Sequence, residues 1–319
     1  MLITKNKRIL DILKTIEEIV DNVNCILITG ETGTGKTELA KYIYQKSKTF
    51  NSKLVIVNLE SIPENLIDSE LFGYKRGAFT DAKEDREGLI ESANNGTLVL
   101  DEIGDLPIYV QAKFLDVIQE RHFKRLGENK YREINLRFIS CSNKDLNKMI
   151  NEKSFREDLY YRLSNFEFKI PPLRERREDI PILVDYFVNI FSKKYNKNIK
   201  GISPDFYSVI VDYKWPGNIR ELSNVIERII STVKSNIITV DDIPYDLVER
   251  TYISMSDNGE ELSKIANFFE SLKIFPKLDK IEEIYIKTVL KQVNYNKAKA
   301  ADILGIDRSS IYRKIKDIT

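Results

Sequence analysis

The chain has 319 residues, of which 42% are hydrophobic, and this is enough to form a buried core. Charged residues make up 31%, but their signs nearly cancel to a formal net charge of +1, which excludes a global electrostatic argument for binding nucleic acid or an anionic membrane. No run approaches the ~18 apolar residues of a membrane span, and the N-terminus lacks the apolar segment of a signal peptide, so we expect a cytoplasmic protein with no membrane partner.

Short apolar runs alternate with helical patterns through the first half of the chain. Cys25 and Cys141 lie in two of these runs and predict buried, reduced thiols, with a disulfide between them as the alternative. The pattern predicts strands at 25–29, 54–58, 97–101 and 136–142, and helices at 37–47, 64–72, 85–92 and 110–120. Such alternation predicts an α/β fold with a mostly parallel sheet and helices on both faces.

The pattern changes at Pro171-Pro172, which interrupts regular secondary structure. After this point nearly all residues have helical periodicity, with the clearest stretches at 178–195, 204–213 and 218–231. The last segment is helical again but is interrupted at Gly305. The sequence therefore predicts an α/β domain over 1–172, a small helical domain over 173–250, a linker over 251–280 and an all-α domain over 281–319.

A complete phosphate-binding motif, G-x-x-x-x-G-K-[ST], lies between the first predicted strand and a predicted helix. In such a loop the backbone N–H groups and the positive end of the helix dipole face phosphate oxygens. The lysine reaches the β- and γ-phosphates, and the last hydroxyl binds Mg²⁺. The alternative is a glycine-rich turn without a ligand. The residues expected to bind ATP are Gly30, Glu31, Thr32, Gly33, Thr34, Gly35, Lys36 and Thr37.

A pair of carboxylates, Asp101 and Glu102, ends the apolar strand 97–101. The carboxyl ends of strands are where open α/β sheets bind ligands. We expect Asp101 to hold Mg²⁺ together with Thr37. Glu102 is positioned to polarise the attacking water as a general base. The phosphate loop upstream favours this interpretation over a strand end that merely becomes polar.

Three arginines could stabilise the charge that develops on the γ-phosphate: Arg156, Arg162 and Arg220. Spacing alone favours solvated arginines on a helix for the first two.

Several ordered segments resemble the AAA+ ATPase activators of sigma-54 RNA polymerase, the bacterial enhancer-binding proteins. Residues 70–82 resemble the GAFTGA loop with its lead-in, and 155–163 resemble the arginine-finger segment. Residues 171–180 resemble the connection into the lid, and 215–222 resemble the sensor II segment. The resemblance runs from about residue 1 to 250 and resumes at the C-terminus. It implies an AAA+ P-loop NTPase sheet with a helical lid and a small helix-turn-helix domain.

The resemblance also implies roles for single residues. Arg156 and Arg162 would be trans-acting fingers that reach the nucleotide of a neighbouring subunit, which requires a homo-oligomeric ring, typically a hexamer. Asn143 would be sensor I, Arg220 would be sensor II, and Asn58 would be the switch partner of Glu102.

The resemblance places the contact with sigma-54 at Phe79 and Thr80. From the residues alone, a loop flanked by Gly73 and Gly77 that exposes an aromatic ring suggests a binding loop, and a hairpin whose Phe79 folds onto the core is the alternative. The sequence departs from the family motif at Asp81, where the motif has its second glycine, and this adds a negative charge at the tip.

The C-terminal segment predicts a helix over 296–304, a stop at Gly305 and a second helix over 308–316, which is the pattern of a helix-turn-helix. Between Lys291 and Thr319 there are seven Lys and Arg residues against three Asp, a local basic patch. A helical hairpin used for oligomerisation is the alternative. The segment resembles the Fis-type domain of the same family, which usually dimerises. The residues expected to contact double-stranded DNA are Arg308, Ser309, Ser310, Arg313 and Lys314.

These observations predict an ATP- and Mg²⁺-dependent activator that remodels the sigma-54 RNA polymerase holoenzyme while its dimeric tails bind upstream DNA. A remodelling ATPase with another target and a DNA-binding repressor regulated by ATP are the alternatives.

Overall fold

The computed structural model describes residues 2–48, 51–244, 247, 277–293 and 295–307. The chain forms two compact units. The first unit comprises residues 1–197 together with 214–231, and the second comprises 198–213 together with 232–319.

A five-stranded parallel sheet is the centre of the first unit, in the order β2-β5-β8-β1-β9. The strands are β1 (Cys25–Thr29), β2 (Leu54–Asn58), β5 (Thr97–Asp101), β8 (Arg137–Ser142) and β9 (Glu167–Lys169). The three inner strands are almost entirely buried, as a parallel sheet covered on both faces requires. The predicted α/β class and parallel sheet are therefore confirmed.

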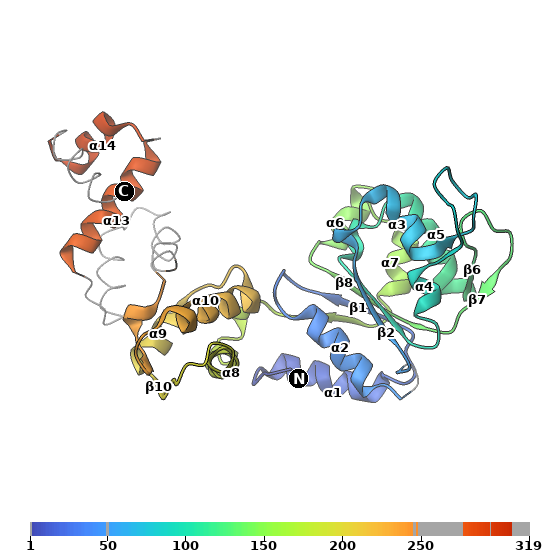
Figure 1. Cartoon of the computed structure of the whole chain (residues 1–319), viewed down its shortest axis with the longest axis horizontal. Coiled ribbons are helices and arrows are strands. Elements are labelled where there is room, and N and C mark those ends of the chain that lie inside the picture. The colour runs from blue at the N-terminus through green and yellow to red at the C-terminus, as the bar shows by residue number, and fades with distance from the viewer. Residues whose placement is uncertain (1, 49–50, 245–246, 248–276, 294, 308–319) are drawn as a thin grey trace. The chain divides into compact units, whose positions relative to one another are not determined.

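Alternate side chains of the sheet enter two separate cores, one on each face. Ile26 and Ile28 of β1 pack with the helices α1 (Lys7–Ile19) and α2 (Lys36–Lys46). Leu27 lies in the other core. The helices of that face are α3 (Glu64–Phe72), α4 (Leu89–Ser92), α5 (Ile108–Glu120), α6 (Leu146–Asn151) and α7 (Glu157–Leu163), and Figure 1 shows them on the side of the sheet opposite α1 and α2.

Two short hairpins project beyond this second group of helices (Figure 1). The first pairs β3 (Gly73–Tyr74) with β4 (Arg86–Glu87), and the second pairs β6 (His122–Phe123) with β7 (Arg132–Glu133). The prediction of a helix over 85–92 is wrong in its first half, because this segment first returns along β3. A Cβ on Gly88 would lie 2.4 Å from the main-chain N of Gly73, so the close crossing of the two strands requires glycine.

The two hairpins are joined to each other through their main chains. Lys75 N donates to Leu126 O at 2.9 Å, and Leu126 N donates to Gly73 O at 2.9 Å. Gly127 has a φ of +73°, and a Cβ there would lie 2.9 Å from the Cβ of Ala78.

Two long helices complete the first unit, α8 (Asp179–Lys194) and α10 (Asn218–Thr232). Three 3-10 turns also belong to this unit: η1 (Leu59–Ser61), η2 (Ile103–Asp105) and η3 (Leu173–Glu175). None of the helices in the described part of the chain is long and apolar enough to span a membrane.

The second unit contains α9 (Pro204–Asp212), η4 (Val240–Asp242) and the parallel pair β10 (Gly201–Ile202) and β11 (Ile237–Ile238). Two further helices, α13 (Leu278–Gln292) and α14 (Lys297–Leu304), enclose a small apolar core that includes Ile286, Leu290 and Ala300. Gly305 ends α14 in the left-handed conformation, with a φ of +63°, and this confirms the predicted stop.

Candidate nucleotide site

The loop between β1 and α2 has the backbone of a phosphate-binding loop. Gly33 and Gly35 have φ values of +79° and +102°, a backbone conformation that residues with a Cβ rarely adopt. A Cβ on Gly33 would also lie 2.4 Å from Gly217 O, so the loop packs directly against the chain that enters α10. Gly33 O accepts a hydrogen bond from Ile219 N at 2.9 Å. The loop is therefore fixed at its outer side by α10.

The ammonium group of Lys36 lies under this loop. Its Nζ donates to Gly30 O at 3.0 Å and to Glu31 O at 3.4 Å, and its side chain is only 6% exposed. Glu102 Oε1 lies 3.7 Å from the same nitrogen. A buried cation held by carbonyl oxygens and one carboxylate provides a charge for an anion that enters the loop.

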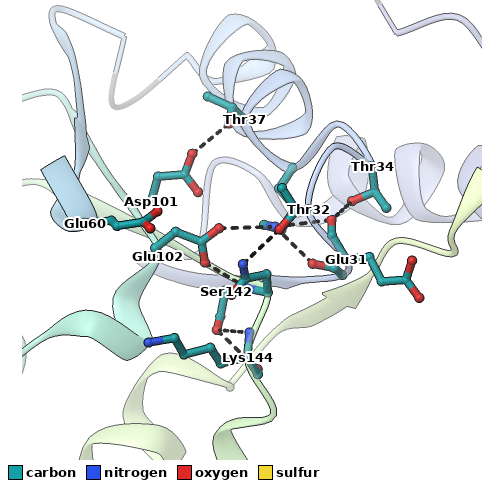
Figure 2. A network of polar contacts seen from close by, with 12 residues as sticks. Glu31, Thr32, Thr34, Thr37, Glu60, Asp101, Glu102, Ser142 and Lys144 are labelled. Carbon is teal, nitrogen blue, oxygen red and sulfur yellow. Dashed lines mark hydrogen bonds and ion pairs between the residues drawn. The ribbon is translucent and has the colours of Figure 1, made fainter. Parts of the chain in front are cut away.

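Thr37 and Asp101 face each other across the carboxyl end of the sheet (Figure 2). Thr37 Oγ1 donates to Asp101 Oδ2 at 2.9 Å. The second carboxylate oxygen, Oδ1 of Asp101, is buried and has no hydrogen-bond partner among the described residues. A hydroxyl beside an unused carboxylate oxygen fits a hard cation such as Mg²⁺, which binds through one or two protein oxygens together with phosphates.

Glu102 is held in an unusual backbone conformation at the start of η2. Its φ of +59° lies in the left-handed region, which costs free energy for a residue with a Cβ and often marks a functional site. Glu102 Oε2 accepts a hydrogen bond from Asn143 N at 3.0 Å. Asn143 Nδ2 in turn donates to Thr32 Oγ1 at 2.9 Å, so the end of β8 joins the carboxylate to the phosphate loop.

The side chain of Asn58 is engaged elsewhere. Asn58 pairs with Asp101 in the register of β2 and β5, but its Oδ1 accepts from Glu60 N at 3.0 Å and so caps η1. Among the described residues, no hydrogen bond or ion pair joins Asn58 to Glu102. The structure therefore brings Glu102 together with Asn143 and Lys36 rather than with Asn58.

The carboxylate of Glu31 points away from the loop interior. It accepts two hydrogen bonds from the Arg174 guanidinium, at 2.8 and 2.6 Å, and one from Asn218 Nδ2 at 3.2 Å. The hydrogen bonds from Arg174 lower the pKa of this carboxyl below its ordinary value. Asn218 is fully buried, has a φ of +54° and also donates to Thr32 O at 3.0 Å. These two residues fasten the loop to η3 and α10.

A cavity of about 470 Å³ opens beside the phosphate loop. Lys36, Thr37, Asp101, Glu102 and the exposed side chain of Arg220 line one part of it. The rest is mainly apolar, and sequence reasoning missed the residues that form it because no motif marks them. They are Leu2, Ile3, Thr4 and Ile9 near the N-terminus, Leu183, Tyr186 and Phe187 of α8, and Ile219 of α10.

Arg156 and Arg162 lie at opposite ends of α7, and neither lines this cavity. Arg156 donates two hydrogen bonds to Asp158, at 3.0 and 2.8 Å, and these raise the pKa of its guanidinium. Arg162 is exposed and borders a second cavity with Cys25, at the amino end of β1. Since the phosphate loop follows the carboxyl end of β1, Arg162 lies at the other edge of the sheet.

Phe79 and Thr80 form the tip of the first hairpin. Ala82 N donates to Phe79 O at 3.0 Å, which closes a four-residue turn. The Phe79 ring packs edge-on against Tyr74, with 4.8 Å between centroids, and remains 43% exposed. Asp81 is exposed and is not among the described residues with positive φ, so the turn accommodates it without strain.

The five residues predicted to contact DNA lie outside the described residues, which end at Asp307.

Three family models match successive parts of the chain. A sigma-54 interaction domain matches residues 2–169, an AAA+ ATPase lid domain matches 174–258, and a bacterial regulatory protein of the Fis family matches 277–317.

Curated proteins are similar over nearly the whole chain. The regulatory protein AtoC of Escherichia coli K12 is 39% identical over 316 residues, which are 99% of this chain and 67% of AtoC. The phenol regulator MopR of Acinetobacter guillouiae is 36% identical over 313 residues, 98% of this chain and 55% of MopR. The chain thus spans about half to two thirds of the length of these relatives.

Solved structures of NtrX are similar to this chain over nearly its whole length. NtrX from Brucella abortus in complex with ADP has a TM-score of 0.72 and 30% identity, over 99% of this chain and 69% of NtrX. NtrX in complex with ATP gives a TM-score of 0.70.

Proposed function

The chain belongs to the family of AAA+ sigma-54-dependent transcriptional activators, and on this premise we propose that it hydrolyses ATP in a homo-oligomeric ring to open promoters bound by sigma-54 RNA polymerase. The observation that carries the proposal is the convergence of Lys36, Asp101 and Glu102 on one cavity at the carboxyl end of the sheet. This placement is the one that P-loop ATPases require.

The triphosphate enters the loop from Gly30 to Thr37, where main-chain N–H groups and Lys36 bind its oxygens. Mg²⁺, held by Thr37 and Asp101, would neutralise charge on the β- and γ-phosphates. The buried, unpartnered Oδ1 of Asp101 supports this role.

Glu102 orients and deprotonates the water that attacks the γ-phosphate. Its hydrogen bond with Asn143 and its contact with Lys36 fix the carboxylate at the edge of the cavity. Asn143 serves as sensor I through its link to Thr32. Asn58, one strand away, is the switch partner that would bind Glu102 in another nucleotide state. Arg220 lines the cavity as sensor II.

Arg156 and Arg162 act on the nucleotide of the neighbouring protomer. Both guanidinium groups lie outside this protomer's own nucleotide cavity, which supports a role in trans. An oligomer, for which we propose a hexameric ring, then has composite sites in which each protomer stabilises the transition state of the next.

The hairpin tip with Phe79 and Thr80 binds sigma-54, and the tail, with Arg308, Ser309, Ser310, Arg313 and Lys314 at the second helix, binds upstream DNA as a dimer. Tethering by the tail raises the local concentration of the ring near the polymerase. In this scheme residues 1–172 carry catalysis, 173–250 form the lid, 251–280 form the linker, and 281–319 bind DNA.

Transcription from a sigma-54 promoter with purified components tests this function. The full chain should produce open complexes only when sigma-54 and hydrolysable ATP are both present. Lys36→Ala should be inactive, whereas Lys41→Ala, on an exposed part of α2, should retain activity. Open complexes that form equally well without ATP would refute the proposal.

A further inference from the structure

The segment before α1, residues 2–6, is fixed to the first residue of α8. Thr4 Oγ1 donates to Asp179 Oδ2 at 2.8 Å. Lys5 N and Asn6 N donate to Asp179 Oδ1 at 2.5 and 3.2 Å. The Asp179 side chain is fully buried, and its acceptors are turned toward a segment more than 170 positions earlier in the chain. We call residues 2–6 the N-terminal strap.

The same carboxylate is connected to the phosphate loop. Arg176 Nη1 lies 3.9 Å from Asp179 Oδ2, and Arg176 Nη2 donates to Thr34 O at 2.7 Å. Arg176 is 2% exposed, and its burial lowers the pKa of the guanidinium although Asp179 opposes this shift. Asp179 and Arg176 therefore form one buried unit with the strap on one side and the loop on the other.

The strap is also a wall of the nucleotide cavity. Leu2, Ile3 and Thr4 line it together with Leu183, Tyr186 and Phe187 of α8, in addition to the residues of the phosphate loop. Among the described residues, the main-chain N–H and C=O of Ile3 make no hydrogen bond. An aromatic base that fills this part of the cavity would meet apolar side chains on its faces and main-chain polar groups of the strap at its edge.

We propose that Asp179 is a positioning residue for the nucleotide base: it holds the strap in place so that the main chain of the strap selects adenine. Adenine presents an amino donor next to a ring acceptor, which complements one C=O and one N–H. Guanine presents a carbonyl acceptor next to a ring N–H donor, which is the reverse order. A strap fixed in one register therefore discriminates between the two bases, and a loosened strap does not. This inference rests on the proposed ATP-binding function.

Thr4→Val tests the inference because it keeps the shape of the side chain and removes only the hydroxyl that donates to Asp179. The KM for ATP should rise on the order of tenfold, as expected for one lost hydrogen bond to a buried charged acceptor, with kcat nearly unchanged. The preference for ATP over GTP should fall by a similar factor. Inorganic tripolyphosphate has no base, so its inhibition constant should stay the same.

Thr15→Val is the matched control, since Thr15 is exposed on α1 and its hydroxyl donates to Asp11 O within the same helix. It should change none of these values. Asp179→Asn should act in the same direction as Thr4→Val but more strongly, with its fold verified by circular dichroism.

The inference is overturned if Thr4→Val leaves the KM for ATP unchanged, or if it weakens tripolyphosphate as much as ATP, since the latter would indicate a general disturbance of the loop. A wild-type chain that binds no ATP would instead refute the proposed function.

Discussion

Oε1 of Glu102 lies 3.7 Å from Nζ of Lys36, and both side chains are almost entirely buried. An incoming triphosphate would compete with this carboxylate for the same ammonium group, and in the proposed mechanism this competition would free Glu102 for catalysis. A residue in this position should matter for chemistry more than for affinity.

We therefore expect Glu102→Gln to reduce kcat for ATP hydrolysis by about 10²- to 10⁴-fold, the range for loss of a general base. The dissociation constant for ATP should stay the same or decrease, because the amide no longer attracts Lys36. Steady-state phosphate release and equilibrium nucleotide binding measure the two quantities. Asp105→Asn, which removes a partly exposed carboxylate partner of Lys144, should leave both intact. A parallel loss of affinity would argue against a catalytic role.

Removal of Mg²⁺ should abolish hydrolysis, because Asp101 and Thr37 offer only two protein oxygens and the phosphates must supply others. The melting temperature should rise with MgATP and rise less with ATP in EDTA. Asp101→Asn should show the smaller rise even with Mg²⁺ present. A variant that keeps the full Mg²⁺-dependent rise of the wild type, together with full activity, would exclude Asp101 as a ligand.

If Arg162 acts in trans, two variants that are each inactive should regain ATPase activity when they are mixed in one oligomer. Lys36→Ala disables a protomer's own nucleotide site, and Arg162→Ala disables the site of its neighbour. An equimolar mixture should regain ATPase activity well above either variant alone.

The mixture of Lys36→Ala with Glu102→Gln is the matched control and should stay inactive, because both defects lie in the same protomer's site. If Arg162 instead served its own protomer, the first mixture would also remain inactive.

Phe79→Ala should separate hydrolysis from promoter opening. The ring contacts Tyr74 at the hairpin and does not line the nucleotide cavity, so the basal ATPase rate should remain within about twofold of wild type. Open-complex formation should be lost. Tyr131→Ala, an exposed aromatic on the second hairpin, is the control. A variant that still opens promoters would show that the tip does not bind sigma-54.

Both cysteines should resist thiol reagents while the chain is folded. Burial raises the pKa of Cys25 to about 11 and that of Cys141 well above its ordinary value, and only the thiolate reacts. Since the folded state retains these protons, the free energy of unfolding should fall as pH rises from about 9 towards about 11. A chromogenic disulfide reagent at pH 8 should label both thiols only in urea, and rapid labelling of the native chain would contradict their burial.

The sequence predicted the strands that are apolar runs well and the polar ones poorly. The inner strands at Cys25–Thr29 and Thr97–Asp101 were predicted with their observed bounds, because a covered parallel strand is a continuous apolar run. The edge strand Leu54–Asn58 was also predicted with its bounds, since four of its five residues are apolar although they are only partly buried or exposed. The edge strand Glu167–Lys169 was missed, since two of its three side chains are exposed and polar. Strand β4 at 86–87 was also missed. Its pairing with β3 depends on the close approach of the main chains at Gly73 and Gly88, which a local sequence pattern does not encode.

Some residues of the candidate site were predicted from the sequence and others were not. The phosphate loop and the pair Asp101 and Glu102 were visible because each is contiguous in sequence and lies at a strand end. Thr4, Arg176 and Asp179 were not visible, because their connection depends on tertiary contacts across more than 140 positions. Glu31 could be read only as a loop residue, and its bonds to Arg174 and Asn218 appear once the chain is folded.

The pairing of the two hairpins has a mechanical consequence. From Glu102 the chain passes through η2 and α5 to β6, and at Leu126 it is hydrogen-bonded to the base of the loop that carries Phe79. If the proposed function holds, a load on the tip would reach Glu102 through this continuous stretch of backbone. Resistance from the target would then shift the carboxylate beside Lys36, and the load would set the rate of hydrolysis.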